Sequence, residues 1–244
     1  MDEEKKVVFK AMDGGWWYPK PHISMTADCV IFGFDGTGLK ILLIQRDKYP
    51  YKEHWALPGG FMDIEETIEQ CAERELREET ELSGIPMHKF NVYTKVTRDP
   101  RERVVTVAFF ALAKITEVKG DTDAKKAEWK SVDDLPGLAF DHDQIVKDAL
   151  NALRERMHFD PIGFELLPEV FTMPQLLKLY EVILGEKFDR RNFAKKIKKL
   201  GIVEEVRSRG SEAASAGGRV WRKYRFIKGM YDQLKNTKKS RHEF

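Results

Sequence analysis

The strongest constraint on the fold is the stretch 59–82, where a pair of glycines leads into a segment rich in glutamate. Asp63 followed three residues later by Glu66 is a helix-capping pattern, and no proline or glycine interrupts the chain from there to Thr80. We therefore expect a helix that is capped by Asp63 and ends at about Thr80.

Helical periodicity places three acids of this segment, Glu75, Glu78 and Glu79, on its apolar face. The apolar residues of that face are Ile64, Ile68, Cys71, Ala72 and Leu82. The opposite, solvated face is expected to hold Glu69, Glu73, Arg77 and Thr80. Three carboxylates on an inward face repel one another, so this helix requires a cation beside it.

Two kinds of cation are available. Arg74 can pair with Glu78 one turn later, but it lies at the edge of the apolar face and cannot satisfy all three acids. Carboxylates three and four residues apart suit Mg²⁺ or Mn²⁺, which prefer oxygen ligands. The alternative is an ordinary Glu/Arg-rich helix stabilised by pairs one turn apart. The position of the acids on the apolar face favours the metal.

The same stretch resembles the Nudix box: Gly, five residues, Glu, seven residues, then Arg-Glu-apolar-any-Glu-Glu-any-Gly-apolar. The matching residues are Gly60, Glu66, Arg74, Glu75, Leu76, Glu78, Glu79 and Leu82. So many fixed positions make the match specific. Glu81 departs from the pattern because the family has glycine there, and we expect the helix to close differently, through Ser83 and Gly84.

The resemblance implies an α/β fold, an α/β/α sandwich with a mixed sheet, and a divalent metal site. The metal, Mg²⁺ or Mn²⁺, would be held by Glu75, Glu78, Glu79 and the carbonyl of Gly59, and the three glutamates would be the catalytic acids. In the family such sites cleave nucleoside diphosphates linked to another moiety. Which carboxylate acts as the base stays open.

Further candidate ligand residues lie around this stretch: Arg46, Trp55, Gly60, Phe61, Arg98 and Glu128. Arg46 ends a predicted strand and either reaches a phosphate or ribose or is simply solvated. Trp55 and Phe61 flank the glycines, where a base could stack, although core packing is the commoner role. Arg98 opens a connection with three arginines that either binds an anion or is solvated. Glu128 is a candidate for a further base or metal ligand.

The remaining N-terminal elements follow from local patterns. Strands are expected at 27–34 and 39–45 as one hairpin, at 92–97 and 104–113 as a second, and at 128–132. An amphipathic helix is expected at 143–158. These elements give a first domain at 1–158, followed by a linker rich in proline and glycine at 159–168.

The C-terminal part has a different character. Thr172 and Asp189 cap predicted helices at 175–184 and 190–200, and strands are expected at 202–207 and 219–227. This order is typical of a winged helix-turn-helix, here at 169–235, with a disordered tail at 236–244. The expected DNA contacts are Arg190, Arg191, Asn192, Lys195, Lys198, Lys199, Arg207, Arg209 and Arg219.

Charge supports a nucleic-acid partner for that domain. Residues 161–244 carry 19 Lys and Arg against 10 Asp and Glu, whereas the rest of the chain carries 23 against 30. Double-stranded DNA is the expected partner. The alternatives are a basic module that binds an acidic protein and a dimerisation appendage.

The sequence also indicates the compartment. The only cysteines, Cys29 and Cys71, lie in apolar patterns as core residues, which favours a reducing environment. The N-terminus has no apolar signal core, and no run reaches the roughly 18 apolar residues of a membrane span. We expect a cytoplasmic protein without a membrane partner.

The whole chain resembles the Nudix-related regulators of NAD and sugar metabolism, in which ADP-ribose or a similar metabolite releases the protein from its operator. The resemblance includes residues 18–21, 55–61, 98–101, 139–142 and 189–193. It implies a homodimer that binds DNA and an ADP-ribose-like nucleotide. The alternative is a Mg²⁺-dependent pyrophosphatase with an accessory basic domain.

Overall fold

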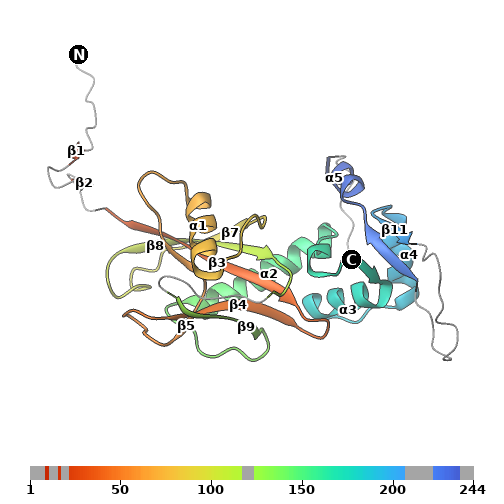
Figure 1. Ribbon diagram of the computed structural model, residues 1–244, viewed down its shortest axis with the longest axis horizontal. Helices are drawn as coiled ribbons and strands as arrows, with labels where there is room; N and C mark the ends of the chain where they lie inside the picture. Colours follow the sequence, from red (N-terminus) through yellow and green to blue (C-terminus); the bar gives the residue numbers. More distant parts are fainter. Residues whose placement is uncertain (1–8, 11–15, 18–21, 117–123, 207–221, 237–244) are drawn as a thin grey trace, which may run out of the picture.

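The structure is a computed structural model and describes residues 9–10, 16–17, 22–116, 124–206 and 222–236. Figure 1 shows two lobes, one built on a large sheet (orange to green) and a smaller one of helices and short strands (cyan to blue). The short strands β1 (Phe9–Lys10) and β2 (Trp16–Trp17) pair with each other ahead of the larger lobe. No helix within the described ranges is long and apolar enough to cross a membrane.

One seven-stranded sheet forms the centre of the larger lobe. Its strands are β3 (Ser24–Phe34), β4 (Leu39–Arg46), β5 (Trp55–Ala56), β6 (Gly59–Phe61), β7 (His88–Tyr93), β8 (Val104–Leu112) and β9 (Ala124–Ser131). The order is β5-β4-β3-β8-β7, with β6 pairing with β3 and β9 with β4. Strands β3 and β8 run parallel and the other pairs antiparallel, so the sheet is mixed, as predicted.

Helices α1 (Ile68–Thr80) and α2 (His142–Phe159) cover opposite faces of this sheet. Alternate residues of a strand point to opposite faces, and in β3 Cys29 packs with the α1 core whereas Val30 packs with the α2 core. Cys29 and Cys71 are both buried as free thiols, as expected of core residues. The lobe is therefore the predicted α/β/α sandwich.

The predicted start of α1 is wrong. The cap is Thr67, whose side chain accepts from the Gln70 N–H while the Gln70 side chain accepts from the Thr67 N–H. Asp63 and Glu66 instead close a turn before the helix, in which the Asp63 N–H donates to Glu66 Oε1 at 2.8 Å. Ile64 consequently lies outside the helix and is 53% exposed, so its predicted place on the apolar face is also wrong.

The end of α1 differs from the prediction as well. Glu81 itself adopts the left-handed conformation, with φ of +61°, and its N–H donates to the Arg77 carbonyl. The helix is thus closed before Ser83 and Gly84 are reached, at a backbone cost of about 1 kcal/mol for a residue with a Cβ. Thr80, expected on the solvated face, is buried, and its hydroxyl donates to the Leu76 carbonyl.

Both predicted hairpins of the sheet form, but two strands are displaced. Strand β7 starts and ends four residues earlier than predicted, and its half-buried side chains Phe90 and Tyr93 pack on the α2 core. Strand β9 begins at Ala124, since it pairs with β4 along that strand's whole length.

The smaller lobe has the predicted helix-helix-hairpin order. Its elements are β10 (Val170–Thr172), α3 (Met173–Leu184), α4 (Arg190–Lys199), β11 (Val203–Val206), β12 (Lys223–Phe226) and α5 (Lys228–Asn236). Strands β10, β12 and β11 form a three-stranded antiparallel sheet. Thr172 and Asp189 cap α3 and α4 as predicted. Strand β10 and helix α5 were not predicted from the sequence.

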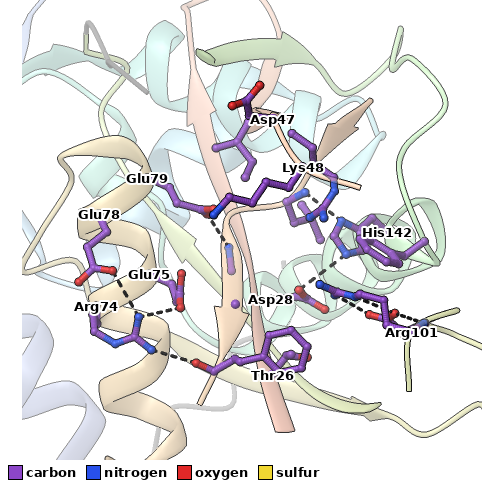
Figure 2. A pocket seen from close by; sticks show the side chains of 18 of the residues that line it. Thr26, Asp28, Asp47, Lys48, Arg74, Glu75, Glu78, Glu79, Arg101 and His142 are labelled. Carbon is purple, nitrogen blue, oxygen red and sulfur yellow. Dashed lines mark hydrogen bonds and ion pairs between the residues drawn. The ribbon is translucent and has the colours of Figure 1, made fainter. Parts of the chain in front are cut away.

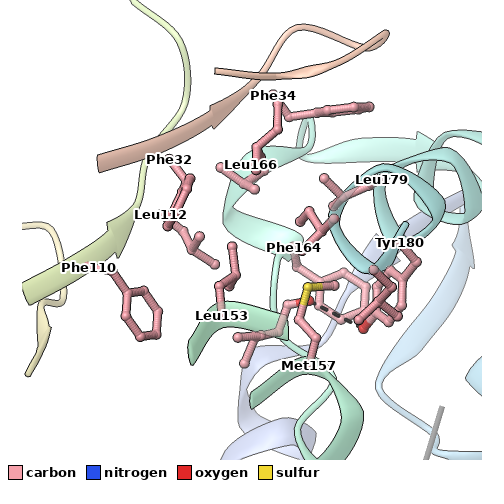
Figure 3. Packing of buried hydrophobic residues seen from close by; sticks show 14 of the residues in the cluster. Phe32, Phe34, Phe110, Leu112, Leu153, Met157, Phe164, Leu166, Leu179 and Tyr180 are labelled. Atoms are coloured by element: carbon pink, nitrogen blue, oxygen red, sulfur yellow. Dashed lines mark hydrogen bonds between the residues drawn. The ribbon is translucent and has the colours of Figure 1, made fainter. Parts of the chain in front are cut away.

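Residues 159–168, expected to be a linker, contribute to the core. The short 3-10 helix η1 (Phe164–Leu166) carries buried side chains, and Ile162 and Leu167 beside it are also buried. These residues join one hydrophobic cluster with α2, α3 and the β3 side chains Phe32 and Phe34 (Figure 3). The two lobes therefore share a continuous core.

Candidate functional site

A cavity of about 460 Å³ opens between α1, strand β6, the end of β4 and the first turn of α2. In Figure 2 the acids of α1 lie on one side of this cavity, and Arg101 and His142 lie on the other. The sequence motif and residues distant from it thus meet at one site.

The acidic wall depends on two glycines in β6. The Gly59 N–H donates to Glu79 Oε2 at 2.8 Å, and Gly59 adopts φ of +154°. A Cβ on Gly60 would lie only 2.4 Å from Glu75 Oε1, and a Cβ on Gly59 only 2.1 Å from the Ala27 carbonyl oxygen. Only glycine lets the strand approach the carboxylates this closely.

Burial makes the charged forms of two of these acids costly. It raises the pKa of Glu79 to about 8, although the Gly59 N–H partly opposes the shift. Burial also raises the pKa of Glu75, against the hydrogen bond from Arg74. These carboxylates lack sufficient positive charge around them, as the sequence suggested.

Arg74 contributes more than predicted. Its guanidinium donates to Glu66 and Glu75 at 2.7 Å and to Glu78 at 3.3 Å, and also to the Phe61 carbonyl. The predicted pair with Glu78 is confirmed, and the turn before α1 also brings Glu66 and Phe61 around the guanidinium.

The predicted metal ligands Glu75, Glu78 and Glu79 line the cavity together with Gly59. Their carboxylate oxygens are the donors that Mg²⁺ or Mn²⁺ prefers, and the raised pKa values of Glu75 and Glu79 suit a site completed by a cation. Among the described residues, however, no three acidic, His or Cys side chains are already arranged to hold a metal ion. Arg74 instead forms ion pairs with two of these acids, Glu75 and Glu78.

The opposite wall combines arginines with aromatic rings. The guanidinium carbon of Arg46 lies 4.9 Å from the centre of the Phe140 ring, and that of Arg101 lies 5.0 Å from the centre of the Phe61 ring. Burial, followed by the charge of Arg101, lowers the pKa of Arg46. Arg46, Gly60 and Phe61 thus line the cavity, whereas the importance of Arg101 and Phe140 was missed.

Arg98 was expected to contact a ligand, but its guanidinium is committed elsewhere. It donates to Asp28 at 3.1 Å and to both carboxylate oxygens of Asp141, and its side chain is only 4% exposed. Burial acts to lower the pKa of Arg98, but the two carboxylates more than reverse this. Arg98 therefore organises the floor of the cavity.

His142 was also missed as part of this floor. Its Nδ1 accepts from the Leu57 N–H at 2.9 Å, which leaves the proton of the neutral ring on Nε2, 3.7 Å from Asp28 Oδ1. Burial lowers the pKa of His142 and keeps the ring neutral. In the sequence, His142 was indicated only by its place in segment 139–142, which is part of the resemblance to the Nudix-related regulators.

Two predicted ligand residues lie outside the cavity. Trp55 packs against the core on the α2 side, with the Lys130 ammonium 4.4 Å from the centre of its ring. Glu128 pairs in register with Leu43 and forms ion pairs with Lys126 and Lys130. The prediction that Glu128 supplies a base or a metal ligand is not supported, because the register of β9 turns it away from the acids of α1.

A second candidate surface lies on α4. Phe193 and Ile197 anchor this helix in the core, and all the predicted DNA contacts on it are exposed: Arg190, Arg191, Asn192, Lys195, Lys198 and Lys199. The Lys198 ammonium lies 5.2 Å from the centre of the Tyr224 ring, on the side facing β12. Arg207, Arg209 and Arg219, expected in the wing, lie outside the described residues.

Two family models match the chain, the NUDIX domain over residues 23–150 and the NrtR DNA-binding winged helix domain over residues 163–226. A protein of Acinetobacter baylyi called ADPR responsive transcriptional repressor is 34% identical over 220 residues, which cover 88% of this chain and 86% of that protein. The chain belongs to the NrtR family. The resemblance to Nudix-related regulators is therefore confirmed.

Solved structures of an NrtR from Shewanella oneidensis show the same architecture. The complex with a 27mer DNA has a TM-score of 0.71 at 26% identity and covers 85% of this chain and 95% of its own. The Nudix domain with ADP ribose has a TM-score of 0.53 at 31% identity and covers 56% of this chain and 94% of its own. An ADP-ribose pyrophosphatase of Methanocaldococcus jannaschii is 44% identical over 109 residues, 45% of this chain and 64% of that protein.

Proposed function

We propose that this protein is a transcriptional regulator of the NrtR type, whose winged helix binds double-stranded DNA and whose Nudix domain binds ADP-ribose or a close analogue. The observation that carries the proposal is that one continuous core connects two features. They are a cavity with acidic and basic walls and an exposed basic helix, α4. The first suits a metal-bound diphosphate, and the second suits a nucleic-acid backbone.

DNA contact is assigned to α4. A winged helix places its second helix in the major groove, and here that helix is α4, anchored by Phe193 and Ile197. Arg191, Lys195 and Lys199 are exposed on the side away from these anchors. The wing arginines 207, 209 and 219 remain predicted backbone contacts.

Ligand contact is assigned to the cavity between α1 and Phe140. A diphosphate fits between the acidic wall, through a divalent ion, and the guanidinium groups of Arg46 and Arg101. Phe61 and Phe140 support these two guanidinium groups, because Arg101 lies over the Phe61 ring and Arg46 over the Phe140 ring.

Hydrolases with a Nudix domain use a divalent metal, and we assign Mg²⁺ or Mn²⁺ to Gly59, Glu75, Glu78 and Glu79 of this chain. Bound there, such an ion would polarise the diphosphate and lower the pKa of a coordinated water. Gly59 and Gly60 leave room for the carboxylates, while Arg98 and His142 hold the cavity floor.

We further propose that the protein acts in the cytoplasm as a homodimer. The Shewanella oneidensis NrtR was solved on a 27mer, which exceeds two helical turns of about 10.5 base pairs each. Such a length accommodates two recognition helices on successive major-groove faces. A two-fold dimer would match a palindromic operator.

Hydrolysis of the ligand is a second candidate function. The box is complete except at Glu81, and Glu81 takes the left-handed conformation that the family glycine supplies, so the end of α1 closes normally. The likeness to the Methanocaldococcus jannaschii pyrophosphatase supports the same candidate. Ligand binding and ligand cleavage are compatible in one site.

One experiment tests DNA binding, ligand identity and coupling together. Full-length protein is titrated onto fluorescent DNA from its own upstream region, with and without ADP-ribose and Mg²⁺. We expect binding that weakens steeply with salt and that ADP-ribose weakens further. Binding no stronger than that of the full-length variant with Lys195→Ala and Lys199→Ala would remove the regulator proposal. Release of AMP from ADP-ribose, measured in parallel, decides the hydrolase candidate.

A further inference from the structure

We propose that helix α2 couples the ligand cavity to the DNA-binding lobe, and that Arg154 is the residue that joins its far end to α3. The inference rests on the proposed function, and it names the route by which occupancy of that cavity reaches the recognition helix. Three groups of contacts support the inference. Two lie at the ends of α2, and the third joins α3 to α4.

The first turn of α2 forms part of the cavity wall. Asp141 holds the N-cap position but makes no side-chain capping bond, since its carboxylate binds Arg98 at 2.7 and 3.1 Å. His142 accepts from the Leu57 N–H in the connection between β5 and β6, which leads to the glycines. Phe140, in a left-handed conformation with φ of +57°, lies against both cavity arginines. A ligand that alters these groups therefore acts directly on the helix start.

The helix is stiff enough to carry that displacement. It spans His142–Phe159 without proline or glycine, and 18 residues at 1.5 Å each give a rod of about 27 Å. Ile145, Val146 and Ala149 hold its middle against the sheet. Its last two turns leave the sheet and enter the core shared with the DNA-binding lobe, as Leu153 and Met157 show in Figure 3.

The far end of α2 is fixed to the end of α3. Arg154 Nε donates to the Ile183 carbonyl at 2.7 Å, one of the carbonyls that a helix C-terminus leaves without an intrahelical partner. The turn that follows, at Gly185, has φ of +75° and leads directly to the Asp189 cap of α4. Arg154 therefore ties α2 of the ligand-binding lobe to the end of α3, from which the chain turns into α4.

Packing extends the connection to α4 itself. Leu179 and Tyr180 of α3 lie beside Met157 in the shared core (Figure 3). The Tyr180 ring meets the Phe193 ring of α4 edge to face, with centres 5.3 Å apart. A shift of α2 thus reaches the anchor of the recognition helix through one layer of side chains.

An open cleft between the lobes leaves room for such a shift. Its volume is about 730 Å³, and residues of both lobes border it, among them Leu112, Phe164 and Tyr231. Close-packed interfaces resist small displacements, whereas a cleft of this size lets one lobe turn while the shared core stays packed. Arg154 then adds a polar link between the lobes to the apolar contacts of that core.

The test replaces Arg154 by Met, which keeps the aliphatic stem and removes the donor. Fluorescence anisotropy gives the Kd for upstream DNA with and without saturating ADP-ribose and Mg²⁺, and calorimetry gives the Kd for ADP-ribose without DNA. In the wild type we expect ADP-ribose to weaken DNA binding by about tenfold or more. In Arg154→Met that ratio should fall below about twofold, while the Kd for ADP-ribose changes by less than about twofold.

Two further variants separate coupling from stability. Arg154→Lys retains a donor and should restore part of the ratio. Lys147→Met is the matched control, because Lys147 is an exposed cation of the same helix that borders neither cavity and should leave the ratio unchanged. Thermal melting identifies any variant that fails to fold; if Arg154→Met is one, Arg154→Lys and Arg154→Gln carry the test.

The outcomes are distinct. A full ADP-ribose response in folded Arg154→Met, or equal loss of response in Lys147→Met, overturns the assignment of Arg154 while leaving the regulator function intact. A wild type that binds DNA with no response to ADP-ribose overturns the ligand part of the proposed function, and the coupling route with it.

Discussion

The charged groups of the two lobes are held in opposite ways. In the larger lobe, Glu79 and Arg98 are almost completely buried, and each depends on a specific partner. On α4, Arg191, Lys195 and Lys199 are exposed and attached to a helix held by only two buried side chains. Burial makes the first set selective and raises the pKa of Glu79, whereas exposure makes the second set sensitive to salt.

The largest effect is expected on α4. Changing Lys195 and Lys199 to Ala should weaken DNA binding by about 100-fold at low salt and reduce the slope of log Kd against log salt by about two, because two phosphate contacts are lost. Calorimetry should show unchanged ADP-ribose binding. Loss of both DNA binding and ADP-ribose binding would contradict the assignment of these two functions to separate lobes.

The matching change in the cavity is Glu79→Gln. It keeps the acceptor for the Gly59 N–H but removes the charge, so metal-dependent binding or cleavage of ADP-ribose should fall by about two orders of magnitude. DNA binding without ligand should stay as in wild type. Glu69→Gln, on the solvated face of α1, is the control. Equal loss in both variants would contradict a specific role for Glu79.

The buried ion pairs of the larger lobe should dominate its stability. Asp28→Asn leaves Arg98 with Asp141 alone in a buried site and should lower the free energy of unfolding by about 2 kcal/mol. Arg222→Gln, which breaks an exposed pair with Glu205 in the smaller lobe, should have little effect. Urea denaturation of both variants measures their free energies of unfolding. Similar decreases in the two variants would contradict the proposed difference between buried and exposed ion pairs.

The smallest effect concerns pH. Burial raises the pKa of Glu79 to about 8, and the acid must lose its proton before it can bind a cation. Below pH 8, affinity for Mn²⁺ should therefore rise by up to about tenfold per pH unit, and it should flatten above pH 8. Thermal melting at each pH is the control that the protein stays folded across the range. A flat Mn²⁺ profile would show that Glu79 is not a ligand.

The fold followed from local patterns to a large degree, and the errors have local causes. The sandwich, both hairpins and the caps at Thr172 and Asp189 were predicted because each depends on neighbours in sequence. The start of α1 was misplaced because two capping patterns overlap, and the pattern at Thr67 and Gln70 is the one used. Strand β10 has only three residues, and no periodicity is visible at that length.

The site was less predictable, because its floor depends on contacts between distant residues. Arg98 binds Asp28, 70 positions away, and His142 meets the Leu57 N–H across 85 positions. Nothing near Arg98 in the sequence indicates that it is satisfied internally. Glu128 was misassigned for the same reason, since the register of β9 against β4 decides which way it points.

The contacts of Arg74 have a consequence for the chemistry of the box. A divalent ion that takes Glu75 and Glu78 as ligands competes with Nη1 of Arg74, which already donates to one oxygen of each. The protein thereby carries its own competitor, which weakens capture of the ion while no nucleotide is present. Because Nε and Nη2 of Arg74 also donate to Glu66 and to the Phe61 carbonyl, the guanidinium stays anchored and only its Nη1 edge has to give way.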